Sequence, residues 1–462
     1  MEGAVCPSYP KRSPVMTADA QTMRDLELFE STDGTPGVFA LFDYTKTDKG
    51  REKLRALILD DLLTLEQVEN RQSTFRFFRD LDGQAPPVHK NQFLFITQYL
   101  RSKLPMIRNR SPFHMAVTWL RLTLRHKGTG LFSNMEFITE GVTLITGFAR
   151  ALEMFLETIR SADLPLEVGE LAGRIEESLL PVTAHISRLT PSGGHPFRLL
   201  AADRWLRTRG GFYIDTLTDA FALLDAFFSV GATIKRHEMC FPEIIESDRP
   251  FFSARGLYHP FLSRPVTQDF QTPSSFLFLT GPNMAGKTTF LKALGISVLL
   301  GRAGFPVFAR HCRMELFQGL FTSINTEDNI RKGYSYFFSE VHRVKEAGEL
   351  LQKTNRILFI FDELFKGTNI KDAYDASRMV IRKFTLWQRN LFILSSHLIE
   401  LAEESRENPA IAFYYFDSSV VDGRPLFTYK INEGVSRERL GLLILQNEGI
   451  PDLLEPPSSS KE

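Results

Sequence analysis

The segment that most constrains this chain is the apolar run Phe276–Thr280, followed directly by Gly281-Pro282-Asn283-Met284-Ala285-Gly286-Lys287-Thr288-Thr289 and a helical pattern over 290–300. A strand that leads through Gly-x-x-x-x-Gly-Lys-Ser/Thr into a helix is the setting of a phosphate-binding loop. The glycines let the backbone curl so that successive N–H groups face one anion, and the helix adds its positive N-terminal end. We expect Lys287 to reach the outer phosphates of a nucleotide and Thr288 to hold Mg²⁺. The alternative is a glycine-rich turn with an exposed lysine, and the flanking strand and helix favour the phosphate loop.

Two further apolar runs end in polar residues. Ile357–Phe361 ends in Asp362-Glu363, and Leu391–Ser396 ends at His397. Ligands of doubly wound sheets bind at the carboxyl ends of parallel strands, so we expect Asp362 to complete the Mg²⁺ shell and Glu363 to polarise the attacking water. A lone histidine is more often structural, but its place after a third strand favours contact with the γ-phosphate.

Composition excludes several classes of protein. Three cysteines, Cys6, Cys240 and Cys312, are too few and too scattered for a disulfide framework or a zinc site. No unbroken apolar run approaches the length of a membrane span, and no signal peptide is visible, so a cytoplasmic protein without a membrane partner is expected. Lys plus Arg and Asp plus Glu both number 55, so net charge says nothing about nucleic acid.

The pattern along the chain predicts two folded domains with short tails. We expect a disordered tail over 1–15, a helical domain over 16–245, an α/β domain over 246–454 and a polar tail over 455–462. Helical spacing in the first domain relates Leu217, Phe221, Leu224 and Phe228, and likewise Ile145, Phe148, Leu152, Phe155 and Ile159.

Turn and hairpin signals add detail to this division. Arg209-Gly210-Gly211 is expected to form a turn or loop within the helical domain. Ala412–Phe416 and Phe427–Ile431 flank Asp422-Gly423, which predicts an antiparallel hairpin at the sheet edge.

The stretch from Gly83 to Met135 contains no Asp or Glu. Its cations are Lys90, Arg101, Lys103, Arg108, Arg110, Arg121, Arg125 and Lys127, and among them lie Phe93, Tyr99, Phe113 and Trp119. Such cations neutralise phosphates and such aromatics stack on exposed bases. A helical hairpin with aromatic core residues and solvated cations explains the same pattern equally well.

These motifs, in this order, resemble the ATPase domain of the MutS family of DNA mismatch-repair proteins. The Gly-Pro-Asn-Met loop, Asp362-Glu363-Leu364-Phe365-Lys366-Gly367-Thr368-Asn369 and Ser395-Ser396-His397 are similar to motifs of that family. The segment 328–340, which contains Gly333 and Ser335, resembles the family signature that reaches the nucleotide of a partner subunit. The resemblance covers 250–454 almost continuously and extends more weakly over 23–78, which is similar to the start of the family's lever domain. Phe365 and Lys366 stand where the family usually carries Gly and Arg, and Gln268-Asp269 stands where it carries Asn-Asp.

The resemblance implies an α/β P-loop ATPase domain of the ABC type with a mainly parallel sheet, preceded by an all-α lever or core domain. It implies ATP and Mg²⁺ as cofactors, a homodimer with composite ATP sites completed by Ser335, and an ATP-gated clamp on duplex or branched DNA. Repair or recombination proteins are then expected partners. Only about 20 residues precede the lever-like segment, too few for a typical domain, so mismatch recognition is not carried over.

A nucleotide-switched dimeric scaffold for a protein or ribosome partner is the alternative function. A transporter-type ATPase is less favoured, because no Leu-Ser-Gly-Gly-Gln signature precedes the acidic strand.

Overall fold

A computed structural model describes residues 18–29, 34–60, 64–81, 85–107, 112–124, 134–186, 196–324, 336–421, 424–436 and 445–454. The chain divides into two compact units. The helical unit comprises Leu41–Asp60 and Glu69–His237, and the sheet unit comprises Met1–Ala40, Asp61–Val68 and Glu238–Glu462. This division differs from the expected helical range of 16–245, because residues 18–29 pack within the sheet unit.

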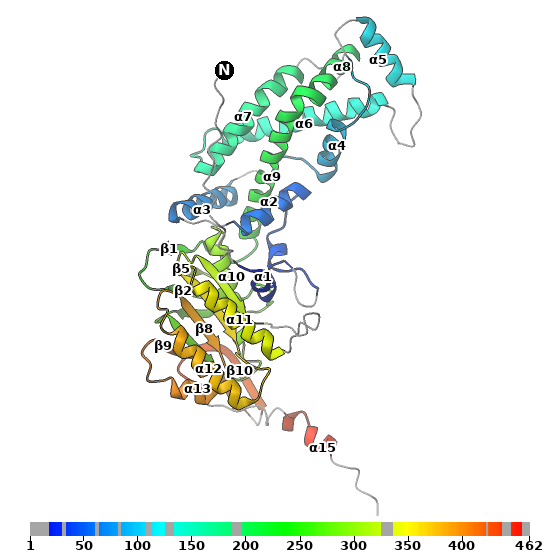
Figure 1. The fold of residues 1–462 in the computed structure, drawn as a ribbon. Coiled ribbons are helices and arrows are strands. Elements are labelled where there is room, and N and C mark those ends of the chain that lie inside the picture. The colour runs from blue at the N-terminus through cyan, green and yellow to red at the C-terminus, as the bar shows by residue number, and fades with distance from the viewer. Residues whose placement is uncertain are drawn as a thin grey trace, which may run out of the picture. The chain divides into compact units, whose positions relative to one another are not determined.

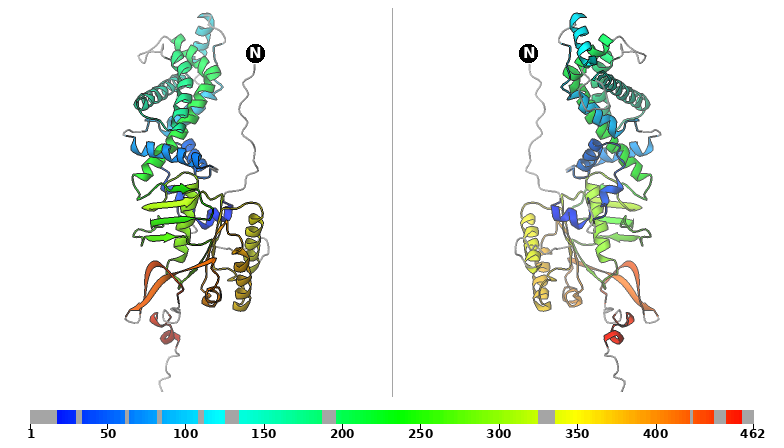
Figure 2. Two further views of the ribbon diagram at one scale, coloured as in Figure 1. Left: turned by 90° about the vertical axis from the view of Figure 1, so that its left-hand side faces the viewer. Right: turned by 90° about the vertical axis from the view of Figure 1, so that its right-hand side faces the viewer.

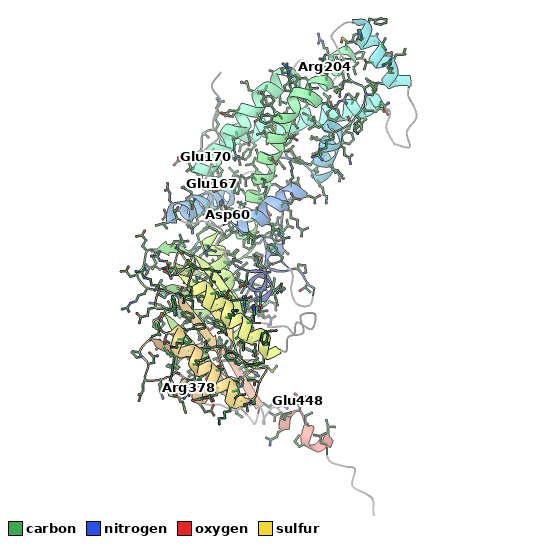
Figure 3. The ribbon with its side chains drawn as sticks, in the orientation of Figure 1. Asp60, Glu167, Glu170, Arg204, Arg378 and Glu448 are labelled. Atoms are coloured by element: carbon green, nitrogen blue, oxygen red, sulfur yellow. The ribbon has the colours of Figure 1, made fainter. Side chains whose placement is uncertain are left out.

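Helices alone make up the described part of the helical unit (Figure 1). They are α2 (Asp48–Ile58), α3 (Leu65–Asp80, whose first residues belong to the sheet unit), α4 (Lys90–Leu100), α5 (Pro112–Leu124), α6 (Asn134–Ile159), α7 (Leu166–Ile186), α8 (Pro196–Trp205) and α9 (Gly211–Ile234). The expected helical spacing is confirmed in α6 and α9, where Ile145, Leu152, Leu217 and Phe221 are all buried. Buried Arg71 bonds to Glu167 and Asp60, which Figure 3 labels, and thereby joins three segments of this unit.

Arg209-Gly210-Gly211 was expected to be a turn, and this expectation is wrong. Leu206–Gly210 form a π-helical segment (η2) that continues α8 directly into α9. Gly210 is required there because a Cβ atom would lie 2.6 Å from the Trp205 ring. By length and composition the continuous helix Pro196–Ile234 could cross a bilayer, but 72% of its most apolar window is buried inside the protein. The helix is therefore the core helix of this unit.

The sheet unit contains two sheets, and the larger one carries the predicted motifs. Its strand order is β10-β9-β4-β8-β7-β6, and every neighbouring pair is parallel except β10 with β9. Its strands are β4 (Phe276–Thr280), β6 (Gly319–Ser323), β7 (Ile357–Asp362), β8 (Leu391–Ser395), β9 (Ile411–Val421) and β10 (Arg424–Glu433). The predicted edge hairpin is confirmed as β9 and β10, although Asp422 and Gly423 lie outside the described residues.

The smaller sheet has the order β1-β5-β2-β3. Its strands are β1 (Glu243–Ile245), β2 (Phe252–Leu257), β3 (Gln268–Gln271) and β5 (His311–Glu315).

Helices cover both faces of the larger sheet, which explains why its central strands are apolar throughout. On one face lie α11 (Tyr336–Leu351), α12 (Ile370–Phe384) and α13 (Ile399–Glu404), and Figure 2 shows the yellow and orange helices together on one side of the strands. In this core the Phe392 ring stacks on two neighbouring rings, with centroid distances of 4.9 Å to Phe359 and 4.8 Å to Phe384. On the other face lies α10 (Lys287–Arg302), where Gly295 approaches Ile360. A short helix, α15 (Ile450–Leu454), follows near the C-terminus.

The described N-terminal residues form α1 (Ala20–Asp25) and the turn before η1 (Val38–Leu41). Asp25 accepts hydrogen bonds from the Thr322 hydroxyl (2.7 Å) and the Ile324 N–H (3.0 Å) at the end of β6. Arg343 of α11 is buried and bonds to both Asp19 and the carbonyl oxygen of Thr322. These polar contacts fasten the N-terminal segment to the edge of the larger sheet.

Candidate functional site

The loop between β4 and α10 has the backbone of an anion-binding turn. Gly281 and Gly286 adopt φ values of 137° and 104°, in a region that residues with side chains rarely enter. Gly286 caps α10, so the helix begins at Lys287 and its first N–H groups face the loop. The Lys287 ammonium donates hydrogen bonds to the carbonyl oxygens of Gly281 (2.8 Å) and Pro282 (3.0 Å). The lysine thus lies across the loop that precedes it.

Thr288 and Asp362 meet at the carboxyl ends of β4 and β7. The Thr288 hydroxyl donates a hydrogen bond of 2.5 Å to Asp362 Oδ2, although the two residues are 74 positions apart. The other carboxylate oxygen of Asp362 is buried and has no hydrogen-bond partner among the described residues. A buried carboxylate oxygen without a donor is costly unless a cation or another donor completes it.

Glu363 lies among three cationic groups. Its carboxylate is 3.3 Å from the Lys366 ammonium and 3.6 Å from His397 Nδ1. His397, followed by the charges of Lys366 and Lys287, lowers the pKa of Glu363 to about 2, and Glu363 in turn raises the pKa of His397. Burial lowers the pKa of Lys287, against the opposing effect of the Glu363 and Asp362 carboxylates. At neutral pH the site therefore holds a firmly ionised Glu363.

A cavity of about 610 Å³ opens over this cluster. Its lining includes the sequence-predicted residues Asn283, Met284, Gly286, Lys287, Thr288, Thr289, Asp362 and Glu363. Gly281, Pro282 and Ala285 belong to the same loop. His397 reaches the cluster through Glu363.

Several residues of the cavity wall were not among the expected site residues. They include His259 and Arg264, from the segment between β2 and β3, and Phe416 and Tyr429, from the β9–β10 hairpin. Gln268 bonds to the carbonyl oxygens of Val266 and Tyr429 and to the N–H of Ile431. The Gln268 side chain is thus committed to fastening the hairpin beside the cavity. The hairpin prediction could have suggested Phe416 and Tyr429, because β9 lies next to the strand before the loop.

The predicted partner-reaching residue, Ser335, lies outside the described residues, and α11 begins one residue after it. Arg108, Arg110, Arg125 and Lys127 of the acid-free stretch also lie outside them.

The described aromatics of the acid-free stretch divide into two groups. Phe93 and Tyr99 are core residues, whereas Phe113 and Trp119 of α5 are 73% and 38% exposed. Lys90 pairs with Asp48 at 2.8 Å. Part of the stretch is therefore ordinary helical core, and its two exposed aromatic residues lie on α5.

Comparison with known proteins relates this part of the chain to a protein family. The model of MutS domain V matches residues 277–457. The DNA mismatch repair protein MutS of Chloroflexus aurantiacus is 32% identical over 201 residues, which are 43% of this chain and 20% of that protein. The proteins of the same name from Chlorobium phaeobacteroides and Chlorobium phaeovibrioides are 29% and 30% identical over 252 and 249 residues, or 52% and 50% of this chain.

The chain spans only 20–28% of the length of these relatives. The matched segment contains the loop between β4 and α10, the acidic pair Asp362-Glu363 and the strand-end His397. Residues 277–457 therefore match MutS domain V, and over this domain the chain is similar to DNA mismatch repair proteins of the MutS family.

Proposed function

We propose that this protein binds ATP with Mg²⁺, hydrolyses it, and uses the cycle to control a homodimer on duplex or branched DNA. The observation that carries the ATPase proposal is the contact between Thr288 and Asp362, at 2.5 Å. It brings the residue after the loop lysine together with the first residue of the acidic pair, under the cavity. P-loop ATPases place a metal-binding hydroxyl and a metal-binding carboxylate in this relation.

The chemistry of the donors fits Mg²⁺. Thr288 and Asp362 supply oxygen ligands, and Asp362 retains one buried oxygen without a donor. Mg²⁺ is typically held by one or two carboxylates together with substrate phosphates and waters. When bound, the metal would neutralise charge on the phosphates.

The residues of the loop then have separate tasks. The ammonium of Lys287 would exchange its two carbonyl partners for phosphate oxygens, and the loop N–H groups, Asn283 and the α10 N-terminus would bind the remaining charge. Glu363, with a pKa of about 2, is a weak proton acceptor. Its task is to orient the attacking water by accepting a hydrogen bond, and the proton leaves on the phosphate product. His397 would connect the γ-phosphate with Glu363.

The test is steady-state ATP hydrolysis by the full chain, alone and with a perfect duplex, a mismatched duplex or a four-way junction at one salt concentration. We expect hydrolysis by the wild type and loss of ATP binding in Lys287→Ala. Lys345→Ala is the matched control, because Lys345 is 67% exposed on α11. Normal ATP binding by Lys287→Ala would remove the phosphate-loop proposal.

Two observations support DNA as the ligand: the relatives are named as DNA mismatch repair proteins, and α5 carries exposed aromatic residues. Exposed Phe113 and Trp119 lie on this helix with Arg121, in a stretch without acidic residues. Aromatic and basic side chains in combination suit nucleic acid. A rate that responds to one of the three DNAs supports a DNA-directed ATPase. An equal rate with all three favours the alternative, a nucleotide-switched scaffold for a protein or ribosome partner, since exposed aromatic residues also suit protein contacts.

A further inference from the structure

Glu340 lies on the first turns of α11 and is only 4% exposed. Its two carboxylate oxygens accept hydrogen bonds from two consecutive backbone N–H groups, those of Lys366 (3.0 Å) and Gly367 (3.1 Å). These N–H groups belong to the loop that follows the acidic pair. Hydrogen bonds between an ionised acceptor and N–H donors are among the stronger ones in proteins.

The loop held by Glu340 has an unusual backbone. Glu363 and Phe365 both adopt φ near 60°, which residues with side chains enter only when the surroundings hold them there. On its strand side the loop is fixed by the Glu363 N–H, which donates to the Ser395 carbonyl oxygen at 2.9 Å. On the side that faces α11, the loop is fixed by the Glu340 carboxylate. Without that carboxylate, the N–H groups of Lys366 and Gly367 would lose their protein partner and the loop would be less firmly held.

A second side chain of α11 contacts the same loop. The Phe337 ring lies 5.9 Å from the ring of Phe365, measured between centroids. Phe337 and Glu340 are three residues apart and so lie on one face of the helix. The first turns of α11 therefore contact the loop through both an aromatic pair and a carboxylate.

The loop in turn determines where Glu363 points. Lys366, whose backbone Glu340 fixes, directs its ammonium to Glu363 at 3.3 Å. A shift of the loop moves both the Glu363 carboxylate and the cation beside it.

We propose that Glu340 is a positioning residue for ATP hydrolysis, which acts by holding the 363–367 loop so that the Glu363 carboxylate meets the attacking water. This inference rests on the proposed ATPase function and deepens it. Because α11 starts directly after Ser335, any displacement of the helix start is passed through Glu340 and Phe337 to Glu363. Glu340 does not touch the nucleotide cavity, so its effect falls on turnover and not on ATP affinity.

The experiment compares Glu340→Gln, Glu340→Asp and Phe337→Leu with the wild type in ATP affinity, kcat, KM and melting temperature. Glu349→Gln is the matched control, since this carboxylate lies on the same helix, is 56% exposed and has only a 3.8 Å contact with Lys345. We expect Glu340→Gln to lower kcat about 10- to 100-fold, the range that small misplacements cost, with ATP affinity within about threefold of the wild type. Glu340→Asp keeps the charge and should recover part of the rate.

A combined variant makes the test specific. Because both residues act on one step, adding Glu340→Gln to Glu363→Gln should cause little further loss in single-turnover hydrolysis. A full multiplicative loss would place Glu340 at another step and overturn the inference, as would a wild-type kcat or a change confined to ATP affinity.

If Glu340→Gln fails to fold, the inference is tested with Glu340→Asp and Phe337→Leu instead. A wild-type kcat in both of these variants overturns it. A wild-type chain that neither binds nor hydrolyses ATP overturns the proposed function itself, which separates the two failures.

Discussion

Glu363 and His397 form an ion pair that exists only when both groups are charged. Glu363 has a lowered pKa of about 2 and His397 a raised one. The stabilisation from Glu363 is present above its unfolded value of about 4.5 and is lost as the pH falls toward 2. The stabilisation from His397 is present below about 6.5 and is lost as the pH rises through its raised pKa. The pair is therefore complete in mildly acidic solution and weakens on the alkaline side.

An NMR titration of His397, assigned with His397→Asn, tests this pairing. We expect a His397 pKa above 6.5 in the wild type and a lower one in Glu363→Gln, because the neutral amide no longer favours the imidazolium. Glu403→Gln, an exposed change on α13, should leave the titration unchanged. Equal pKa values in wild type and Glu363→Gln would show that the two groups do not interact.

The residues that sequence alone could suggest are those adjacent to strand ends. Lys287, Thr288, Asp362 and Glu363 were each expected near phosphate and metal, and the structure brings all four to one cavity. Glu340 and Lys366 lay within motifs resembling those of MutS proteins, but no role was expected of them. Their roles depend on a backbone with positive φ, and side-chain patterns give no direct signal of it.

At the scale of elements, apolar runs identified β4, β7 and β8 because parallel strands covered on both faces are apolar throughout. The packing of α1 was not predictable in this way. Its contacts with β6 join residues about 300 positions apart, and a helix of six residues has too few turns to show a periodic pattern.

The attachment of α1 gives a prediction for stability. Asp25→Ala removes the acceptor of the Thr322 hydroxyl and the buried Ile324 N–H. We expect a loss of about 2–4 kcal/mol in the free energy of unfolding of the sheet unit, since each unsatisfied buried group costs about 1–3 kcal/mol. Urea unfolding monitored by hydrogen exchange of the β6 amides measures this loss of free energy. Asp375→Ala, whose side chain is 54% exposed on α12, should stay within about 0.5 kcal/mol, and an equally small effect of Asp25→Ala would contradict the prediction.

At the scale of the whole molecule, the proposed composite site predicts that nucleotide controls assembly. Glu363→Gln keeps the loop over 281–289 and the Thr288–Asp362 pair, so it should bind ATP, hydrolyse it much more slowly than the wild type and accumulate as a dimer. Light scattering with and without ATP and Mg²⁺ measures this. The matched control is Lys287→Ala, which lacks the loop cation and should show no ATP-dependent change in mass. A Glu363→Gln chain that stays monomeric with saturating ATP would refute the composite site.

The division of the chain also has a consequence for the order of synthesis. Residues 18–40 belong to the sheet unit, whose other large part starts at Glu238, so the helical unit is inserted between the two. Domains generally fold as they leave the ribosome, N-terminal parts first. Here Leu26 and Leu28 are translated before the helical unit, but they are fully buried in the sheet unit, most of which is translated after it. These two side chains therefore lack their packing partners while the helical unit is being translated. We expect a ribosome-associated chaperone to shield them from aggregation during this interval.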